Sequence, residues 1–86
     1  MDELEQYRKK VDQVDDLILK ALCERVKICM AIGLVKKKRG MPTRDVSREK
    51  EVYARVKAKS VESCLDPLQV EAVYREIVNM CSAVQE

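Results

Sequence analysis

Two basic residues on one apolar helix face are the first candidates for chemistry. Apolar residues recur every three or four positions between residues 4 and 36, and Arg25 and Lys36 interrupt this stripe. Their separation along the helix places both on one face, about 16 Å apart. Because a buried cation without a partner is costly, we expect an anionic ligand or, for Arg25, a structural ion pair with Asp15 or another neighbour. Arg8 is rotated by about 100° from this face, so it would join the same site from a second copy of the chain.

A second set of polar residues also follows helical spacing. Asp45, Arg48 and Glu49 share one side of the first turn of a predicted helix. Cys81 and Gln85 are four residues apart at the end of another, where Gln85 continues an apolar line and its amide needs a partner. Each also has a purely structural interpretation, as a helix cap (Asp45), surface helix charges (Arg48, Glu49), a frayed terminus (Gln85) or packing (Cys81).

The composition argues against several kinds of chemistry. The 86 residues contain no histidine, the commonest general base and metal ligand, and the four cysteines form no C-x-x-C pair. We therefore expect no metal site, with the cysteines reduced and used for packing. A net charge of +2 and only three aromatic residues do not favour nucleic-acid binding.

The start of the chain and its hydropathy bear on location. Acidic residues follow Met1, where a secretory signal would have a basic region and an apolar stretch. No apolar run approaches the length of a membrane span. We predict a cytoplasmic protein with no membrane partner.

These side chains must be positioned by helices, because the chain has few breaks. The predicted fold class is all-α, one domain over residues 1–86, with helices at about 3–39, 45–61 and 67–85. Gly40 and Pro42 end the first helix, and Asp45 caps the second. The third begins at Asp66-Pro67, an N-cap followed by proline at the first helical position.

The first helix is too long for a compact monomer. A helix of this length spans about 50 Å, whereas a compact chain of this size has a radius of gyration near 12 Å. Its apolar stripe would be exposed along the overhang, so we predict an intertwined homodimer in which a second copy covers it.

Taken together, the motifs are specific. In order they are Arg8, Val11-Asp12-x-Val14-Asp15, Glu24-Arg25, Ile32-Gly33-x-x-Lys36, Pro42-x-x-Asp45-x-x-Arg48-Glu49, Leu65-Asp66 and Gln85. Over essentially its whole length, the sequence resembles the all-helical class (type II) of chorismate mutase, with no gap between the motifs. The resemblance implies three helices per chain, an intertwined dimer with two active sites and no cofactor. It also implies conversion of chorismate to prephenate on the route to phenylalanine and tyrosine.

The resemblance assigns roles at one end of the substrate. It gives one substrate carboxylate to Arg25 and the other to Arg8 of the partner chain. Lys36 and Gln85 would donate hydrogen bonds to the ether oxygen. This inventory suits the reaction, because a [3,3] sigmatropic (Claisen) rearrangement transfers no proton and needs no histidine. Fixed donors would stabilise the negative charge that grows on the ether oxygen.

The remaining roles concern the ring end of the substrate. By the resemblance, Asp45 and Glu49 address the ring hydroxyl, and Arg48 orients and supports them. Cys81 falls among the substrate-binding residues, at a position where the family often has serine or another small polar residue. Its thiol is a weaker hydrogen-bond partner than a hydroxyl. Thr43 replaces a more usual aliphatic residue after the proline.

Three alternatives stay open from the sequence. An isochorismate pyruvate lyase of the same fold would use similar cations, although the Asp45-x-x-Arg48-Glu49 motif favours the mutase. A non-catalytic helical dimerisation module would use the buried charges only to set register. The basic run from Lys36 to Arg39 is typical of a solvated surface, and it could also bind RNA phosphates.

Overall fold

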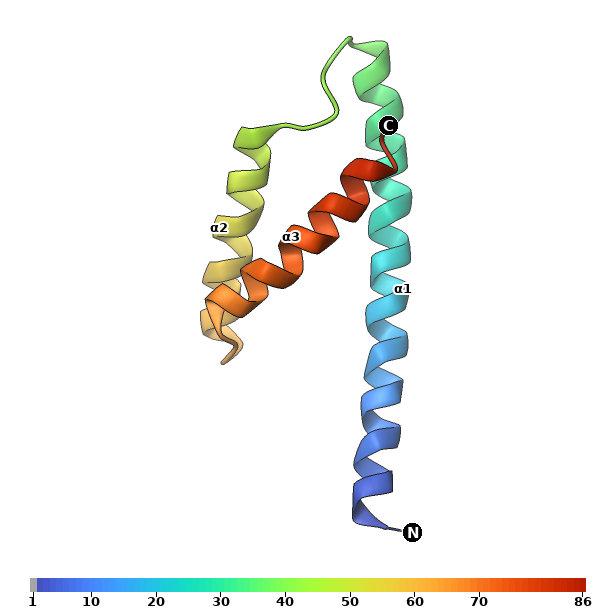
Figure 1. Cartoon of the computed structure of the whole chain (residues 1–86), viewed down its shortest axis with the longest axis vertical. Coiled ribbons are helices and arrows are strands. Elements are labelled where there is room, and N and C mark those ends of the chain that lie inside the picture. The colour runs from blue at the N-terminus through green and yellow to red at the C-terminus, as the bar shows by residue number, and fades with distance from the viewer. Residues whose placement is uncertain (1) are drawn as a thin grey trace.

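The structure is a computed structural model that describes residues 2–86, and in this range it is all helical (Figure 1). Its three helices are α1 (Glu3–Lys38), α2 (Val46–Glu62) and α3 (Pro67–Ala83). The prediction of an all-α chain with three helices is confirmed. The third helix ends at Ala83, whereas the sequence suggested about residue 85, and Gln85 therefore lies just beyond the last turn.

Aspartates begin all three helices. The carboxylates of Asp2, Asp45 and Asp66 accept hydrogen bonds from backbone N–H groups in the first turn of α1, α2 and α3 respectively. Pro67 follows Asp66 at the first helical position, where its missing N–H costs nothing. Gly40 lies just after α1 with φ +66°, a left-handed conformation that favours glycine.

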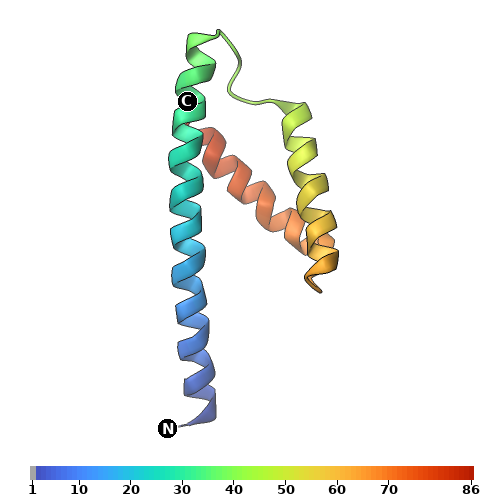
Figure 2. The same ribbon diagram turned by 180° about the vertical axis from the view of Figure 1, so that it is seen from behind.

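The helices form an open arrangement (Figures 1 and 2). Helix α3 packs along α2 and then reaches the C-terminal half of α1, whereas α1 and α2 do not pack against each other. The N-terminal half of α1 projects alone. The molecule measures 57 × 24 × 15 Å, and its radius of gyration is 16.2 Å. A compact chain of this length would have a radius of gyration near 12 Å.

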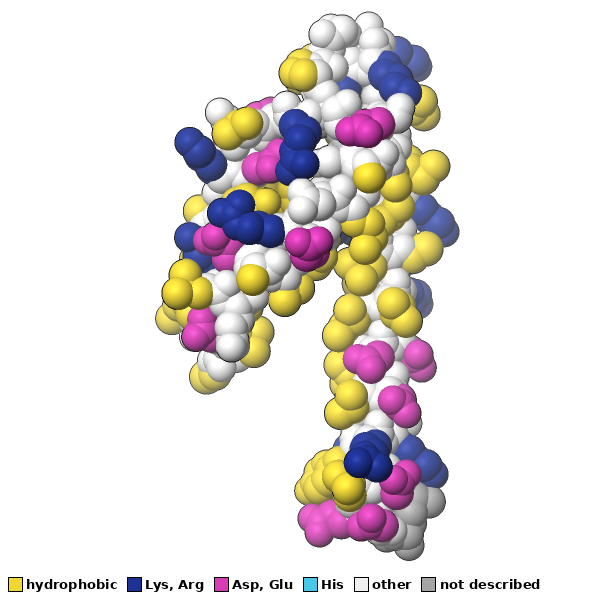
Figure 3. Space-filling model, in the orientation of Figure 1, with side chains coloured by type: hydrophobic (Ala, Val, Ile, Leu, Met, Phe, Trp, Pro, Cys, Tyr) yellow, Lys and Arg dark blue, Asp and Glu magenta, His cyan; other side chains and the backbone are white. Residues whose placement is uncertain are grey.

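The buried core is small and lies mainly between α2 and α3. Val52, Tyr53 and Val78 form its centre, and Tyr74 packs against them. Along α1, by contrast, large apolar side chains are more than half exposed at residues Leu4, Tyr7, Val11, Val14, Leu17 and Ile18. Figure 3 shows apolar side chains along the projecting part of this helix. A continuous apolar face of this kind marks an interaction surface.

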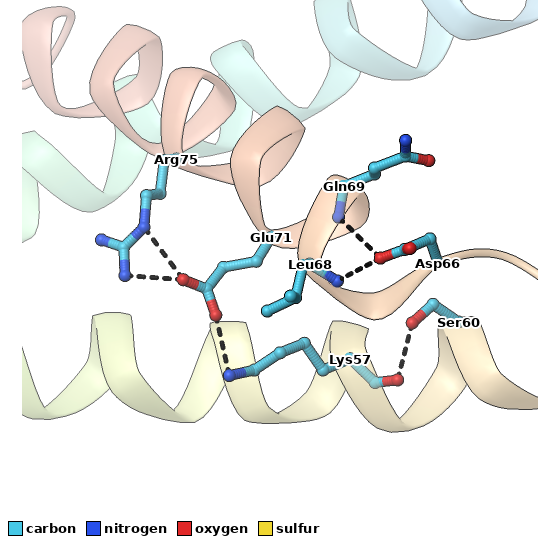
Figure 4. Close-up of polar contacts among 7 residues, drawn as sticks. All are labelled: Lys57, Ser60, Asp66, Leu68, Gln69, Glu71 and Arg75. Carbon is cyan, nitrogen blue, oxygen red and sulfur yellow. Dashed lines mark hydrogen bonds and ion pairs between the residues drawn. The ribbon is translucent and has the colours of Figure 1, made fainter.

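A charged network joins α2 to α3 (Figure 4). The Glu71 carboxylate accepts hydrogen bonds from Lys57, at 2.7 Å, and from Arg75, at 2.8 Å. These two cations lower the pKa of Glu71, so the carboxylate stays ionised. The Arg75 guanidinium also lies 4.5 Å from the centre of the Tyr53 ring, which extends the contact into the core.

None of the helices formed by residues 2–86 is both long and apolar enough to cross a membrane.

The turn after α2 contains a strained residue and generates a first prediction. Cys64 has φ 57°, and the N–H of Leu65 donates to the carbonyl of Ser60 at 2.9 Å, which is the six-residue bond of a Schellman turn. A non-glycine residue in this conformation costs about 1–2 kcal/mol. Because glycine also loosens the unfolded chain, we expect Cys64→Gly to raise the free energy of unfolding by about 0.5–1 kcal/mol.

The matched control makes the same chemical change inside a helix. Cys23→Gly, at an exposed position of α1, should lower the free energy of unfolding by about 0.5 kcal/mol. Thermal melts of both variants at one fixed protein concentration measure the two effects. A melting temperature for Cys64→Gly at or below that of the unaltered chain would contradict the predicted strain.

Candidate active site

A cavity of about 480 Å³ lies where the end of α3 reaches α1 and where α2 begins. Its walls come from all three helices and from the segment between α1 and α2. Seven of the eight site residues predicted from the sequence line it: Arg25, Lys36, Asp45, Arg48, Glu49, Cys81 and Gln85. The fold therefore brings together residues that are up to 60 positions apart in the sequence.

Arg25 is held by sulfur atoms. Its Nη1 lies 2.8 Å from the Sγ of Cys81 and 3.8 Å from the Sγ of Cys29. Among residues 2–86 it makes no ion pair, with Asp15 or with any other carboxylate. Thiols orient the guanidinium without neutralising it, so its charge remains available to an anion in the cavity.

Lys36 and Gln85 form the second polar pair. The Lys36 ammonium donates to the Oε1 of Gln85 at 2.8 Å and to the backbone carbonyl of Thr43 at 2.6 Å. An ammonium has three donors, so one remains for a ligand, and the Gln85 amide nitrogen supplies two more. The pair can therefore donate to a single oxygen in the cavity. Its partners are neutral, as they are for Arg25.

A glycine allows this pair to form. Gly33 is buried in α1, and a Cβ built on it would lie 2.9 Å from the Cα of Gln85. Real Cβ atoms do not approach so closely, and the obstacle is backbone. The sequence contained a signal, because glycine inside a helix costs about 1 kcal/mol relative to alanine and indicates close packing when it occurs.

Glu49 is paired with Arg44. The Arg44 guanidinium donates to both carboxylate oxygens, at 3.0 and 2.9 Å, and its Nη2 donates to the Oδ1 of Asn79 at 3.2 Å. These hydrogen bonds and the Arg44 charge lower the pKa of Glu49. The sequence suggested Arg48 for this supporting role, but the Arg48 guanidinium lies 3.3 Å from Glu51 instead.

Asp45 has a structural role that leaves it in the cavity wall. Its Oδ1 accepts a hydrogen bond from the backbone N–H of Arg48 at 3.0 Å, so Asp45 is the helix cap that the sequence suggested. This bond uses one of its two carboxylate oxygens, and the other remains an acceptor. Both Asp45 and Arg48 line the cavity, which combines two carboxylates with several cations.

Arg8 is the one predicted site residue that does not line the cavity of its own chain. It lies in the first turns of α1, about 26 Å along the helix from Arg25. Its guanidinium forms an exposed ion pair with Glu5 at 3.0 Å. The cavity of one chain therefore lacks this residue.

Sequence reasoning missed one charged wall residue. Arg55 lines the cavity from α2, two turns after Arg48 on the same face. That seven-residue spacing was the available signal. The other missed wall residues are apolar or small, and only the packing of the helices identifies them: Ile28, Ile32, Val52, Val78, Ser82 and Cys29.

Two known proteins are similar to this chain in sequence. The chain is 33% identical over 89 residues to the bifunctional chorismate mutase/prephenate dehydratase of Aquifex aeolicus (strain VF5), covering 100% of this chain and 25% of that protein. It is 28% identical over 86 residues to a chorismate mutase of Methanocaldococcus jannaschii, covering 100% of this chain and 87% of that protein.

A solved structure and a family model extend the comparison. A conserved hypothetical protein from Pyrococcus furiosus superposes with a TM-score of 0.81 at 29% identity, over 100% of this chain and 99% of that one. The model of the family described as chorismate mutase type II matches residues 7–86. The resemblance noted in the sequence is thereby confirmed, and the chain belongs to the chorismate mutase type II family.

Proposed function

We propose that this chain rearranges chorismate to prephenate, as a single domain over residues 1–86 that acts in an intertwined homodimer. Membership of the family supports isomerase activity. The observation that carries the proposal is the pairing of two cavity cations with neutral groups only: Arg25 with thiols, and Lys36 with amide and carbonyl oxygens. Such cations are poised for an anion, and chorismate carries two carboxylates.

The first contribution to rate is orientation. In this rearrangement one carbon–oxygen bond breaks while one carbon–carbon bond forms within the same molecule, and no proton is transferred. The substrate must be held in a chair-like conformer. In the proposed site Arg25 binds one carboxylate and Arg8 of the partner subunit binds the other. Two guanidinium forks at fixed positions select that conformer, since each can bind a carboxylate through two parallel hydrogen bonds.

The second contribution is electrostatic. As the carbon–oxygen bond breaks, negative charge grows on the ether oxygen. Lys36 and Gln85 would donate to this oxygen, and their geometry is already set by their mutual hydrogen bond. Donors that are in place before the reaction need no reorganisation, so they stabilise the transition state more than the ground state. Asp45 and Glu49 would accept from the ring hydroxyl.

The second copy is proposed on two grounds. The apolar face of α1 is exposed over its N-terminal half, where another chain would cover it. Arg8 lies on that half and outside the cavity of its own chain. A symmetric dimer would satisfy both, because each chain would cover the other's α1 and lend it an arginine.

Two other activities are distinguishable in solution. An isochorismate pyruvate lyase would release pyruvate from isochorismate, so assays with both substrates separate it from the mutase. A helical dimerisation module would convert neither, and chorismate would not raise its melting temperature. The predicted place on the route to phenylalanine and tyrosine, in the cytoplasm, remains part of the proposal.

Removing the Lys36 ammonium tests the electrostatic role. We expect Lys36→Ala to lower kcat by at least about 10²-fold, the effect of losing one donor to a developing oxyanion. Lys38→Ala, an exposed position two residues on, is the matched control and should retain activity. The measurement is the rate of chorismate disappearance, with prephenate identified as product. Turnover of Lys36→Ala within a few fold of the unaltered protein would refute the assignment.

Mixing two inactive variants tests the shared site. Arg8→Ala and Arg25→Ala homodimers should each have both sites impaired. After co-refolding, a mixed dimer has one site with both arginines and one with neither, so a one-to-one mixture should recover about a quarter of the unaltered activity. No recovery on mixing, despite mixed dimers detected by mass, would contradict the contribution of Arg8 across the interface.

The pH dependence of kcat tests the roles of Gln85 and Glu49. Gln85 does not titrate, and Arg44 lowers the pKa of Glu49 against the smaller opposing effects of burial and of Asp45, so kcat should stay flat from mildly acidic to mildly alkaline pH. Arg44→Gln removes the largest of the effects that lower this pKa, so the pKa of Glu49 rises. Activity should then begin to fall at a higher pH on acidification than in the unaltered protein.

Two outcomes of these pH profiles would contradict the roles given to Gln85 and Glu49. A steep acid optimum in the unaltered protein would indicate a carboxylic acid in the role given to Gln85. An acid limb unchanged by Arg44→Gln would show that the ionisation of Glu49 does not matter for turnover.

A further inference from the structure

Two of the four cysteines meet in the wall of the cavity. Cys29 on α1 and Cys81 on α3 both contact the same guanidinium nitrogen of Arg25, at 3.8 and 2.8 Å. The two sulfur atoms are therefore both partners of a single atom, and burial and then a hydrogen bond to Cys81 raise the pKa of the Cys29 thiol. Residues more than 50 positions apart thus form a pair of neighbouring thiols.

The surroundings of this pair decide its chemistry. Both residues are buried in the protein, with 8% and 3% of their surface exposed, yet both line the cavity. Among residues 2–86, no third Cys, Asp or Glu completes a metal-binding group with them. Cys23 and Cys64 are exposed and lie outside the cavity wall. Two adjacent thiols without a third ligand are suited to forming a disulfide.

We propose that Cys29 and Cys81 form an oxidation-sensitive dithiol, which a low-molecular-weight disulfide converts to an intrachain disulfide that blocks the cavity. The blocking of activity rests on the proposed function, whereas the disulfide does not. The bond would join α1 to α3 at the contact that positions the site.

The reaction proceeds by two exchange steps. The Cys81 sulfur, beside the Arg25 cation, attacks one sulfur of the small disulfide as a thiolate. The small sulfur–sulfur bond breaks, and the first small thiol leaves with the proton that Cys81 lost. Cys29 then loses its proton and attacks the Sγ of Cys81, which expels the second small thiol. Two protons and two electrons pass from the protein thiols to the small disulfide, which is reduced to two thiols.

The disulfide would impair the site through Arg25. Once bonded to Cys29, the Cys81 sulfur must take the position that the disulfide geometry requires, which alters its 2.8 Å contact with the guanidinium. The mixed-disulfide intermediate would in addition place a small group inside the cavity. Arg25 then loses its orientation and with it a charged hydrogen bond to the substrate. Because such a bond contributes substantially to binding, activity should fall about tenfold or more.

The experiment uses the full chain with Cys23→Ser and Cys64→Ser, so that only the pair remains. The folded variant is treated with bis(2-hydroxyethyl) disulfide, and its intact mass and turnover of chorismate are followed. We expect a loss of two hydrogens per chain, a peptide map that links Cys29 to Cys81, and lost activity that returns with dithiothreitol. The matched control adds Cys29→Ser, which should stop at a single small-thiol adduct on Cys81.

Each result of this experiment bears on one claim. Circular dichroism verifies that the treated chain is still helical. If this folded chain gains only small-thiol adducts, or links only to another chain, the proposed Cys29–Cys81 dithiol is wrong. A quantitative Cys29–Cys81 disulfide with unchanged turnover would overturn the claim that it blocks the cavity. A reduced protein that converts no chorismate would contradict the proposed function, while the mass measurement would still decide whether the disulfide forms.

Discussion

The close approach of the end of α3 to α1 at Gly33 determines the rest of the site. The Cα of Gln85 occupies the space where a side chain at position 33 would project. This contact places Gln85 beside Lys36, and one turn earlier in α3 it places Cys81 beside Arg25. Because α2 packs on α3 and not on α1, Glu49 of α2 is also positioned relative to the α1 cations through α3. One glycine thus permits the geometry of three helices.

Cations that stabilise the fold have carboxylate partners, whereas Arg25 and Lys36 in the cavity have neutral partners. At the α2–α3 contact, the Glu71 carboxylate neutralises Lys57 and Arg75, and all three are satisfied within the protein. In the cavity, Arg25 and Lys36 meet thiol, amide and carbonyl groups, which fix direction and leave the charge uncompensated. The difference explains why a chain with a net charge of only +2 can present a strongly cationic site.

Helical periodicity and capping made much of this predictable. The capping signals at Asp45 and Asp66-Pro67 directly precede α2 and α3, and Arg25 and Lys36, which share a helix face by their spacing, both line the cavity. The pairing of Glu49 with Arg44 was not predictable, because it depends on the path of a segment without regular structure. Nor were the sulfur partners of Arg25, since only the crossing of α3 over α1 brings Cys81 there.

The size of the core links stability to assembly. Six apolar residues are buried in the described chain, and none has less than 2% of its surface exposed. So small a core rarely supplies more than about 3–5 kcal/mol. In the proposed dimer, the apolar face of α1 would supply the missing burial, and the same face carries Arg8. Folding, assembly and completion of the site would then be one event, so that both stability and activity depend on protein concentration.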